Sequence, residues 1–144
     1  MYINQIMKVF VILLLLISSL SWGRMIALKD YMFENPSLGD NEALYMSSRC
    51  SAIFYHMSKL NKDREDLFKN LNKLQTQFSE MSLMLTMKVL PDESEEELYQ
   101  KTSNTINDMI DEYIELSNNH YKNTGSYLTD SMMNDIEICS SIMR

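Results

Sequence analysis

The chain has 144 residues, with 20 acidic and 13 basic side chains, so its formal net charge at pH 7 is −7. An acidic protein repels phosphate backbones, which argues against nucleic acid as a partner. Only three glycines and two prolines occur, and folds built on tight β-turns need more of both. Length and composition therefore predict one all-α domain that can bury a real core.

The N-terminal residues carry the pattern of a secretory signal peptide. An unbroken apolar run, residues 9–17, follows the single positive charge of Lys8, and a serine-rich stretch comes after it. This order matches the charged, apolar and cleavage regions of an export signal. We therefore expect residues 1–21 to be a signal peptide, with cleavage after Ser21 or Gly23, and the protein to be periplasmic or secreted.

A membrane anchor is the alternative interpretation of the same residues. A spanning helix needs about 20 mostly apolar residues. Residues 9–23 are all that separate Lys8 from Arg24, and several of them are serines. An anchor over residues 6–23 would therefore be short, and we rank it second.

Residues 22–39 are expected to be a lead-in that ends in a turn over 35–39. Asp40 then has the residue type of a helix N-cap. From here on the apolar side chains recur at spacings of three and four, which indicates the inward stripe of a helix. In the first helix, over 40–60, this stripe is Ala43, Met46, Cys50, Ile53, Met57 and Leu60.

The second helix is expected to start after a break at 61–63, with Asp63 as its cap. It should end before Pro91, because proline disfavours helical geometry in the residue before it. Its inward stripe is Leu67, Leu71, Leu74, Phe78, Met81 and Leu85.

The third helix begins at a capping box, since Ser94 and Glu97 can satisfy each other's free backbone amides. It is expected to weaken at 118–119 and to stop over 123–125. Its stripe is Leu98, Thr102, Ile106, Met109, Tyr113 and Leu116. The last helix carries Leu128, Met132, Ile136, Cys139 and Met143. Four amphipathic helices with short connections over 40–144 predict an antiparallel up-and-down bundle. A helical hairpin that dimerises into a four-helix assembly is the alternative.

Both cysteines lie on inward stripes, Cys50 in the first helix and Cys139 in the last. In an up-and-down bundle these helices are antiparallel neighbours, and an exported protein meets an oxidising compartment. The sequence therefore predicts a Cys50–Cys139 disulfide that staples the fold. Two buried free thiols are the alternative. A redox site is disfavoured because no C-x-x-C motif occurs.

Methionine is frequent, with 13 in the chain, and Met81, Met84 and Met87 form an M-x-x-M-x-x-M motif. Thioether sulfur binds Cu(I), so a soft-metal carrier is one hypothesis. On a helix, however, these three side chains spread over an arc of about 120°. The interpretation we favour is that they fill gaps in the core, and we expect no metal and no cofactor.

Other chemistry-bearing side chains form no recognisable site. His56 and His120 lack partners at metal-ligand spacing, and both are expected at the surface. An acidic group on the third helix lacks the calcium-loop spacing and the Glu-x-x-His pairs of di-iron bundles, so we interpret it as a solvated face. Its members are Asp108, Asp111, Glu112 and Glu115. No hydrolase signature occurs either.

Residues 49–55, Arg-Cys-Ser-Ala-Ile-Phe-Tyr, together with a second cysteine near the C-terminus, resemble small exported α-helical proteins of uncharacterised function, hypothetical proteins of bacterial and phage genomes. The resemblance implies no activity, and it agrees with a disulfide and with the absence of an enzyme site. We therefore expect a protein that acts by binding or scaffolding, with an unknown protein partner and no evident small-molecule substrate. Homo-oligomerisation is left open. A Cu(I) carrier is the alternative function, and an enzyme with an unrecognised site ranks third.

Overall fold

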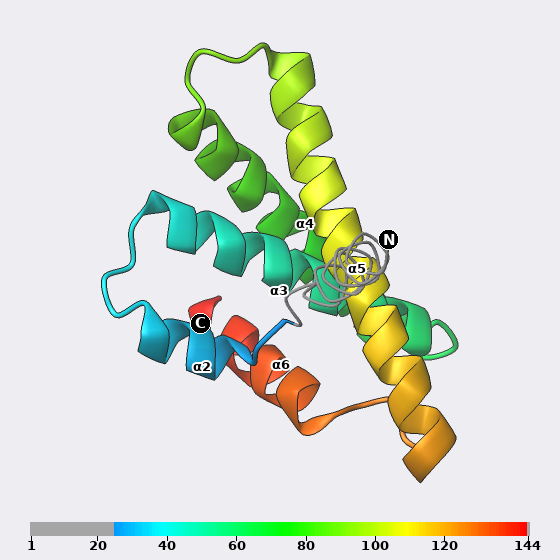
Figure 1. Ribbon diagram of the computed structural model, residues 1–144. Helices are drawn as coiled ribbons and strands as arrows, with labels where there is room; N and C mark the ends of the chain where they lie inside the picture. Colours follow the sequence, from blue (N-terminus) through cyan, green and yellow to red (C-terminus); the bar gives the residue numbers. More distant parts are fainter. Residues whose placement is uncertain (1–24, 144) are drawn as a thin grey trace, which may run out of the picture.

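The computed structural model describes residues 25–143 and, over this range, consists of five α-helices without a strand (Figure 1). The all-helical class predicted from the sequence is therefore confirmed. The predicted signal peptide, residues 1–21, lies outside the described residues. None of the helices in the described range combines the length and hydropathy that a membrane crossing requires.

The helices are α2 (Leu28–Glu34), α3 (Asp40–Leu60), α4 (Glu65–Val89), α5 (Glu95–Thr124) and α6 (Asp130–Ile142). The short helix α2 lies in the segment that we expected to be only a lead-in. A helix of seven residues is too short to be stable through its own propensity. It forms here because it packs against α6 and buries Leu28 completely.

Two of the predicted helix caps are wrong by one residue. Asp40 is the first residue of α3, and Gly39 is the N-cap, where its backbone N–H donates to the Glu42 carboxylate at 3.0 Å. Arg64, rather than Asp63, occupies the N-cap of α4. In both cases an acidic residue stands next to the cap, where the positive end of the helix dipole favours it almost equally.

Three other predicted helix ends are confirmed, whereas Leu128 and Met143, which we expected in the last helix, lie outside α6. Ser94 caps α5, accepting from the Glu97 backbone while its own N–H donates to the Glu97 carboxylate at 3.0 Å. The second long helix, α4, ends at Val89, just before Pro91. Gly125 closes α5 with φ +75°, a left-handed conformation that glycine adopts without a steric penalty.

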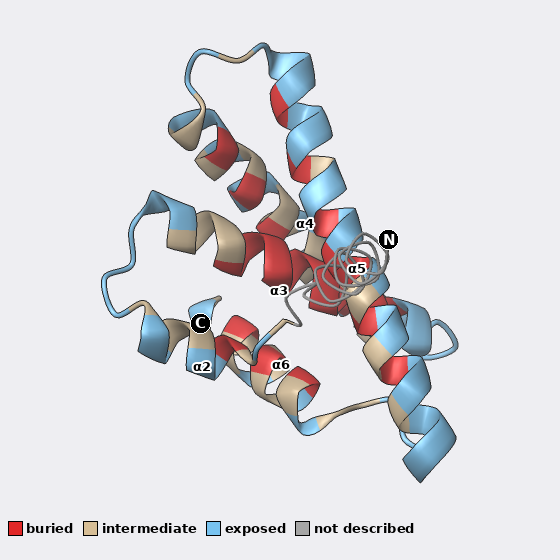
Figure 2. Cartoon of the chain, in the orientation of Figure 1, coloured by how far each residue is buried: buried red, intermediate tan, exposed pale blue. Residues whose placement is uncertain are grey.

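Helix α3 is the centre of the fold, because α4, α5 and α6 all pack on it. Residues 46–54 are buried without interruption, so this stretch is covered all round and not on one stripe alone (Figure 2). A helix enclosed in this way is normally apolar. This one instead carries small hydroxyl side chains and one arginine among its apolar residues, which are the source of the site described below.

The other helices surround α3 unevenly (Figure 1). Helices α3 and α4 lie side by side as a hairpin, and α5 runs obliquely across them. Helices α2 and α6 lie next to each other on another side of α3. Helices α4 and α5 cross at an angle (Figure 1), and a hydrogen bond from the Thr102 hydroxyl of α5 to the Thr86 hydroxyl of α4 at 2.9 Å joins them in the last turn of α4, near the loop 90–94.

The buried face of α4 differs from its predicted apolar stripe. After Phe78 the buried residues are Ser82 and Thr86, and Met81, which we expected inside, is at the surface. Ser82 donates to the Ser47 hydroxyl of α3 at 2.9 Å. Because paired hydroxyls can be buried at little cost, this small polar face lies inside and the neighbouring methionines lie outside.

Candidate functional site

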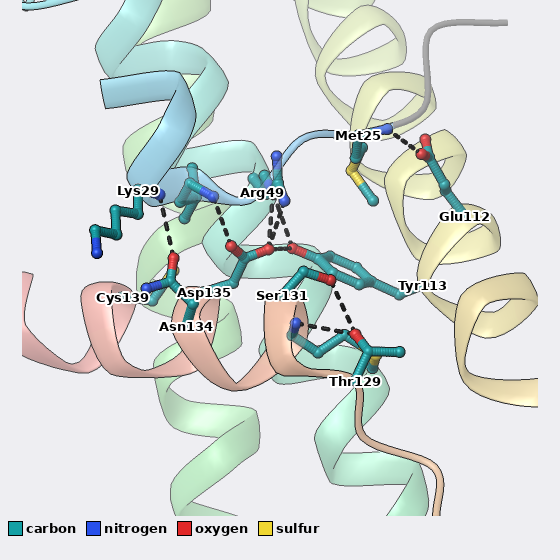
Figure 3. Close-up of polar contacts among 12 residues, drawn as sticks. Met25, Lys29, Arg49, Glu112, Tyr113, Thr129, Ser131, Asn134, Asp135 and Cys139 are labelled. Atoms are coloured by element: carbon teal, nitrogen blue, oxygen red, sulfur yellow. Dashed lines mark hydrogen bonds and ion pairs between the residues drawn. The ribbon is translucent and has the colours of Figure 1, made fainter. Parts of the chain in front are cut away.

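A charged cluster lies in the interior where α3, α5 and α6 meet (Figure 3). Arg49 of α3 donates to the Asp135 carboxylate of α6 twice, from Nη2 at 2.6 Å and from Nε at 3.0 Å. The Arg49 side chain is 1% exposed and that of Asp135 is not exposed at all. A buried ion pair is favourable only when further hydrogen bonds satisfy its remaining atoms.

Those further hydrogen bonds are present. The Tyr113 hydroxyl of α5 donates to Asp135 Oδ2 at 2.6 Å, and the other carboxylate oxygen accepts from the backbone N–H of Leu28 at 2.7 Å. Arg49 Nη1 donates to the Tyr45 hydroxyl at 2.9 Å. One carboxylate thus links four helices, α2, α3, α5 and α6, through a single cluster of hydrogen bonds.

Burial and neighbouring charges shift the pKa values of two members of the cluster, Arg49 and Tyr113. Burial alone would lower the pKa of Arg49, but the neighbouring Tyr113 and Asp135 outweigh it and raise that pKa above its ordinary value. Burial is the main reason that the pKa of Tyr113 is raised, and Asp135 adds to the shift. The surroundings therefore favour the charged form of Arg49 and the protonated form of Tyr113.

The predicted disulfide joins α3 to α6 beside this cluster. Cys50 and Cys139 are bonded, with their Cα atoms 5.5 Å apart and 89 positions apart in the sequence. Both cysteines are fully buried. Each stands near its charged neighbour, because Arg49 precedes Cys50 and Asp135 lies one helical turn before Cys139. The two helices are therefore held together by a covalent bond and an ion pair at almost the same height.

Sequence reasoning missed the ion pair, although a signal for it exists. Asp135 lies three residues after Met132 and four before Cys139, so it falls on the inward stripe of the last helix. A carboxylate on an inward stripe needs a buried partner. Arg49, adjacent to the other cysteine, is the basic residue that the disulfide brings beside it.

The three methionines of the M-x-x-M-x-x-M motif do not lie in the core. Met81, Met84 and Met87 are 36%, 69% and 50% exposed on α4. The core role that we favoured for them is therefore wrong. The reason is the hydroxyl face described above: Ser82 and Thr86 take the inward positions, and the methionines occupy the remaining sides of the helix.

The surface between α4 and α5 is hollowed. One hollow, of about 370 Å³, has Tyr55 of α3 at its side. A second, of about 470 Å³, continues toward the loop 90–94 and shares Leu83 and Tyr99 with the first. We call the two hollows together the α4–α5 groove. From α4 it is lined by Gln75, Thr76, Ser79, Glu80, Leu83 and Met87, and from α5 by Glu95, Glu96, Leu98, Tyr99, Thr102, Ser103, Ile106, Asn107 and Ile110.

The α4–α5 groove has a mixed chemical character. Its deeper lining consists of small hydroxyl side chains and the buried Ile106 and Ile110. Its walls carry exposed Met87 and Tyr99, the latter 62% exposed. The charged residues that line it are Glu80, Glu95 and Glu96. The groove thus combines apolar side chains with negative charge at its walls.

The remaining predicted candidates are placed as follows. His56 is 5% exposed in α3, so its expected surface position is wrong; burial lowers its pKa. His120 lies partly exposed on α5.

In the acidic group of α5, Asp108, Asp111 and Glu115 are exposed as expected, while Glu112 accepts a hydrogen bond from the Met25 backbone. The described residues contain no group of three or more His, Cys, Asp or Glu side chains that could hold a metal ion.

Comparison with known proteins finds no relative. No family model matches this chain, and neither a curated protein nor a solved structure matches it.

Proposed function

We propose that this chain is an exported helical protein that acts by binding another protein and not by catalysis. In this proposal residues 1–21 are removed on export. Residues 40–144 then form an antiparallel bundle whose first and last helices are stapled by the Cys50–Cys139 disulfide. The α4–α5 groove is the contact surface.

The observation that carries the proposal is the α4–α5 groove, which leaves Leu83, Met87 and Tyr99 around an uncovered hollow. Contiguous apolar surface with a polar rim marks sites of protein interaction. Tyrosine and methionine are also enriched in interfaces over the rest of a protein surface. The proposal therefore accounts for apolar side chains that the fold itself does not use.

The rest of the molecule suits a contact role. Helices α4 and α5 are both anchored on α3, which the disulfide and the Arg49–Asp135 pair fix to α6. A rigid base keeps the walls of a groove in position before a partner arrives, and this lowers the entropic cost of binding. The most polar and most buried cluster thus supports the fold, while the contact surface lies elsewhere.

Photo-crosslinking in the exporting cell tests this function. A photoreactive phenylalanine analogue is placed at Tyr99 in the groove and, separately, at Phe33, which is 87% exposed on α2 outside the groove. We expect one discrete crosslinked protein from Tyr99 and none from Phe33. Crosslinks from Phe33 alone would place the contact surface elsewhere, and the absence of crosslinks from both would contradict a contact function.

Mass spectrometry of the exported protein, purified without reductant, tests the export part of the proposal. We expect a chain that starts at residue 22 or 24 and is two hydrogens lighter than its dithiol form. An intact N-terminus with two free thiols would contradict export, and would favour the alternative in which residues 6–23 anchor the protein in a membrane.

A soft-metal carrier is the second candidate, favoured by the exposure of Met81, Met84 and Met87. Thioethers at the surface are free to turn toward a Cu(I) ion, whereas core methionines are not. The triple variant M81L/M84L/M87L keeps the apolar volume and removes the sulfur. Loss of Cu(I) uptake in this variant, but not in the control M133L, would support the carrier; unchanged uptake would exclude it.

A further inference from the structure

The charge around the α4–α5 groove is of one sign. The charged side chains that line it, Glu80 from α4 and Glu95 and Glu96 from α5, are all acidic and exposed. Neither lysine nor arginine occurs among its described lining residues. Among basic residues near the groove, Lys59 lies over the ring of the lining residue Tyr55 at 4.7 Å, while Lys88 pairs with Asp40 and Lys101 with Glu93. An approaching positive charge is therefore attracted at both walls.

The apolar part of the groove is adaptable. Leu83, Met87 and Tyr99 lie between the two hollows or beside them. Methionine is unbranched and polarisable, and it is over-used on surfaces that accept helices of varied sequence. Deeper in the groove, Ser79 and Ser103 leave space for large side chains of a partner. Side chains spaced one helical turn apart on a partner can fill successive hollows of this kind.

The length of the groove matches a helix. Its lining residues on α4 run from Gln75 to Met87, which is 12 positions, or about 18 Å along a helix axis at about 1.5 Å per residue. A bound helix of three to four turns would cover this distance. It would lie along the groove between α4 and α5 and add a further helix to the fold.

We propose that the α4–α5 groove binds a basic amphipathic helix of a partner protein. The apolar face of that helix fills the hollows around Leu83 and Tyr99. Its lysines and arginines face Glu80 on one wall and Glu95 and Glu96 on the other. This inference rests on the proposed contact function and names the chemistry of the partner.

A second copy of this chain fits the groove less well. The chain carries a net charge of −7, and its C-terminal part, residues 91–144, holds 12 acidic and 3 basic side chains. Two copies that meet at an acidic groove repel each other. A basic helix from another protein meets the opposite sign along its whole charged face.

The test uses the oxidised, exported protein and a labelled synthetic peptide of about 18 residues. The peptide has leucines at spacings of three and four and lysines elsewhere, so that it forms a basic amphipathic helix. Two control peptides have the same leucine pattern with glutamate in place of lysine, and the same composition in a scrambled order. Binding is measured by fluorescence anisotropy. We expect saturable 1:1 binding of the basic amphipathic peptide alone.

Matched protein variants then locate the binding. E80Q/E95Q/E96Q removes three charges from the groove, and D111N/E115Q/E137Q removes three exposed charges away from it. Both have the same net charge, so general attraction to the basic peptide changes equally. We expect the groove variant to bind about tenfold more weakly and the control to bind nearly as the unaltered protein does. Equal weakening in both variants would overturn the inference.

A second pair tests the apolar contacts at constant charge. M87Q/Y99Q changes exposed groove residues, and F33Q/M133Q changes exposed residues elsewhere. Both pairs are at the surface, so folding is preserved, and circular dichroism checks that helicity is retained. We expect loss of peptide binding only for the groove pair. Loss from both pairs, or from neither, would contradict a helix seated between α4 and α5.

The outcome separates this inference from the proposed function. If Tyr99 crosslinks a partner in cells but the basic peptide does not bind, the contact function stands and the basic helix is excluded. If neither occurs, the contact function fails as well. Sedimentation velocity tests whether a second copy of the chain occupies the groove. A dimer that dissociates in M87Q/Y99Q but not in F33Q/M133Q would assign the groove to that second copy and overturn the inference.

Discussion

Arg49 and Asp135 form an ion pair at 2.6 Å in a place that water does not reach, one residue from Cys50 and one helical turn from Cys139. The two bonds between α3 and α6 are therefore of different kinds but lie side by side. The disulfide acts mainly on the unfolded chain by restricting its conformations. The ion pair acts on the folded state, since it requires one alignment of α2, α3, α5 and α6. Removing the disulfide and removing the ion pair should therefore have effects on stability that can be measured separately.

Replacing one partner of the ion pair should destabilise the fold strongly. In the variant D135N the Arg49 charge stays buried without its counter-charge, and breaking a buried pair in this way costs about 3–5 kcal/mol. Urea denaturation with the disulfide intact measures the loss. The double variant R49M/D135L removes both charges. Its loss of unfolding free energy should be much smaller than the sum of the losses in the single variants R49M and D135L. Additive losses would contradict a direct coupling between the two side chains.

Removing the disulfide should lower the free energy of unfolding by about 4–5 kcal/mol in the chain-entropy model, because it closes a long loop. C50A/C139A keeps both buried positions apolar and tests this by urea denaturation. Reductant should have the same effect on the unaltered protein and no effect on the variant. Hydrogen exchange adds a local measurement: amides of α6 should lose protection more than those of α4, which packs on α3 without the bond.

Features that depend on residues close together in the sequence could be predicted from the sequence alone. The Ser94–Glu97 capping box, the end of α4 before Pro91 and the stop at Gly125 are local, and each was predicted at its observed position. The Cys50–Cys139 bond followed from placing both cysteines on inward stripes of neighbouring helices.

Features that depend on distant pairing could not be predicted in the same way. Apolar periodicity assigned Met81 to the core, but Ser82 lies inside because Ser47, on another helix, accepts its hydrogen bond. A hydroxyl is buried cheaply only when such a partner exists, and one sequence does not show which helix supplies it. The ion pair is a different case, because Asp135 lies on the inward stripe of the last helix and the predicted disulfide places Arg49 beside it. The α4–α5 groove depends on the angle between two helices and on the side chains between them, which no stripe of residues encodes.

The left-handed end of α5 provides a local test. Gly125 has φ +75° and nothing lies within 4 Å of the position that a Cβ atom would take. G125A should therefore cost about 1–2 kcal/mol through backbone strain alone and not through a clash. Thermal or urea denaturation measures the loss. G125N should cost less, because asparagine adopts this conformation more readily. Equal losses in both variants would contradict a cost that is set by the left-handed backbone conformation.

His56 should make stability depend on pH near neutrality. Burial lowers its pKa below the ordinary value of 6.5, and no partner in the described structure accepts or donates at Nε2. Below pH 6.5 the unfolded chain binds a proton that the folded chain resists. The unfolded state thus holds more protons, and the free energy of unfolding must fall as pH falls from 6.5 toward the lowered pKa.

The limiting slope for one such group is about 1.4 kcal/mol per pH unit. Urea denaturation at several pH values between 7.5 and 5.5 measures it. H56L should remove most of this slope, whereas H120Q, which changes the partly exposed histidine of α5, should leave it in place. The pKa of Glu97 is lowered by its hydrogen bonds to Ser94, so it does not titrate in this range. A slope that survives H56L would therefore have to come from another buried group, and the closed environment assigned to His56 would be wrong.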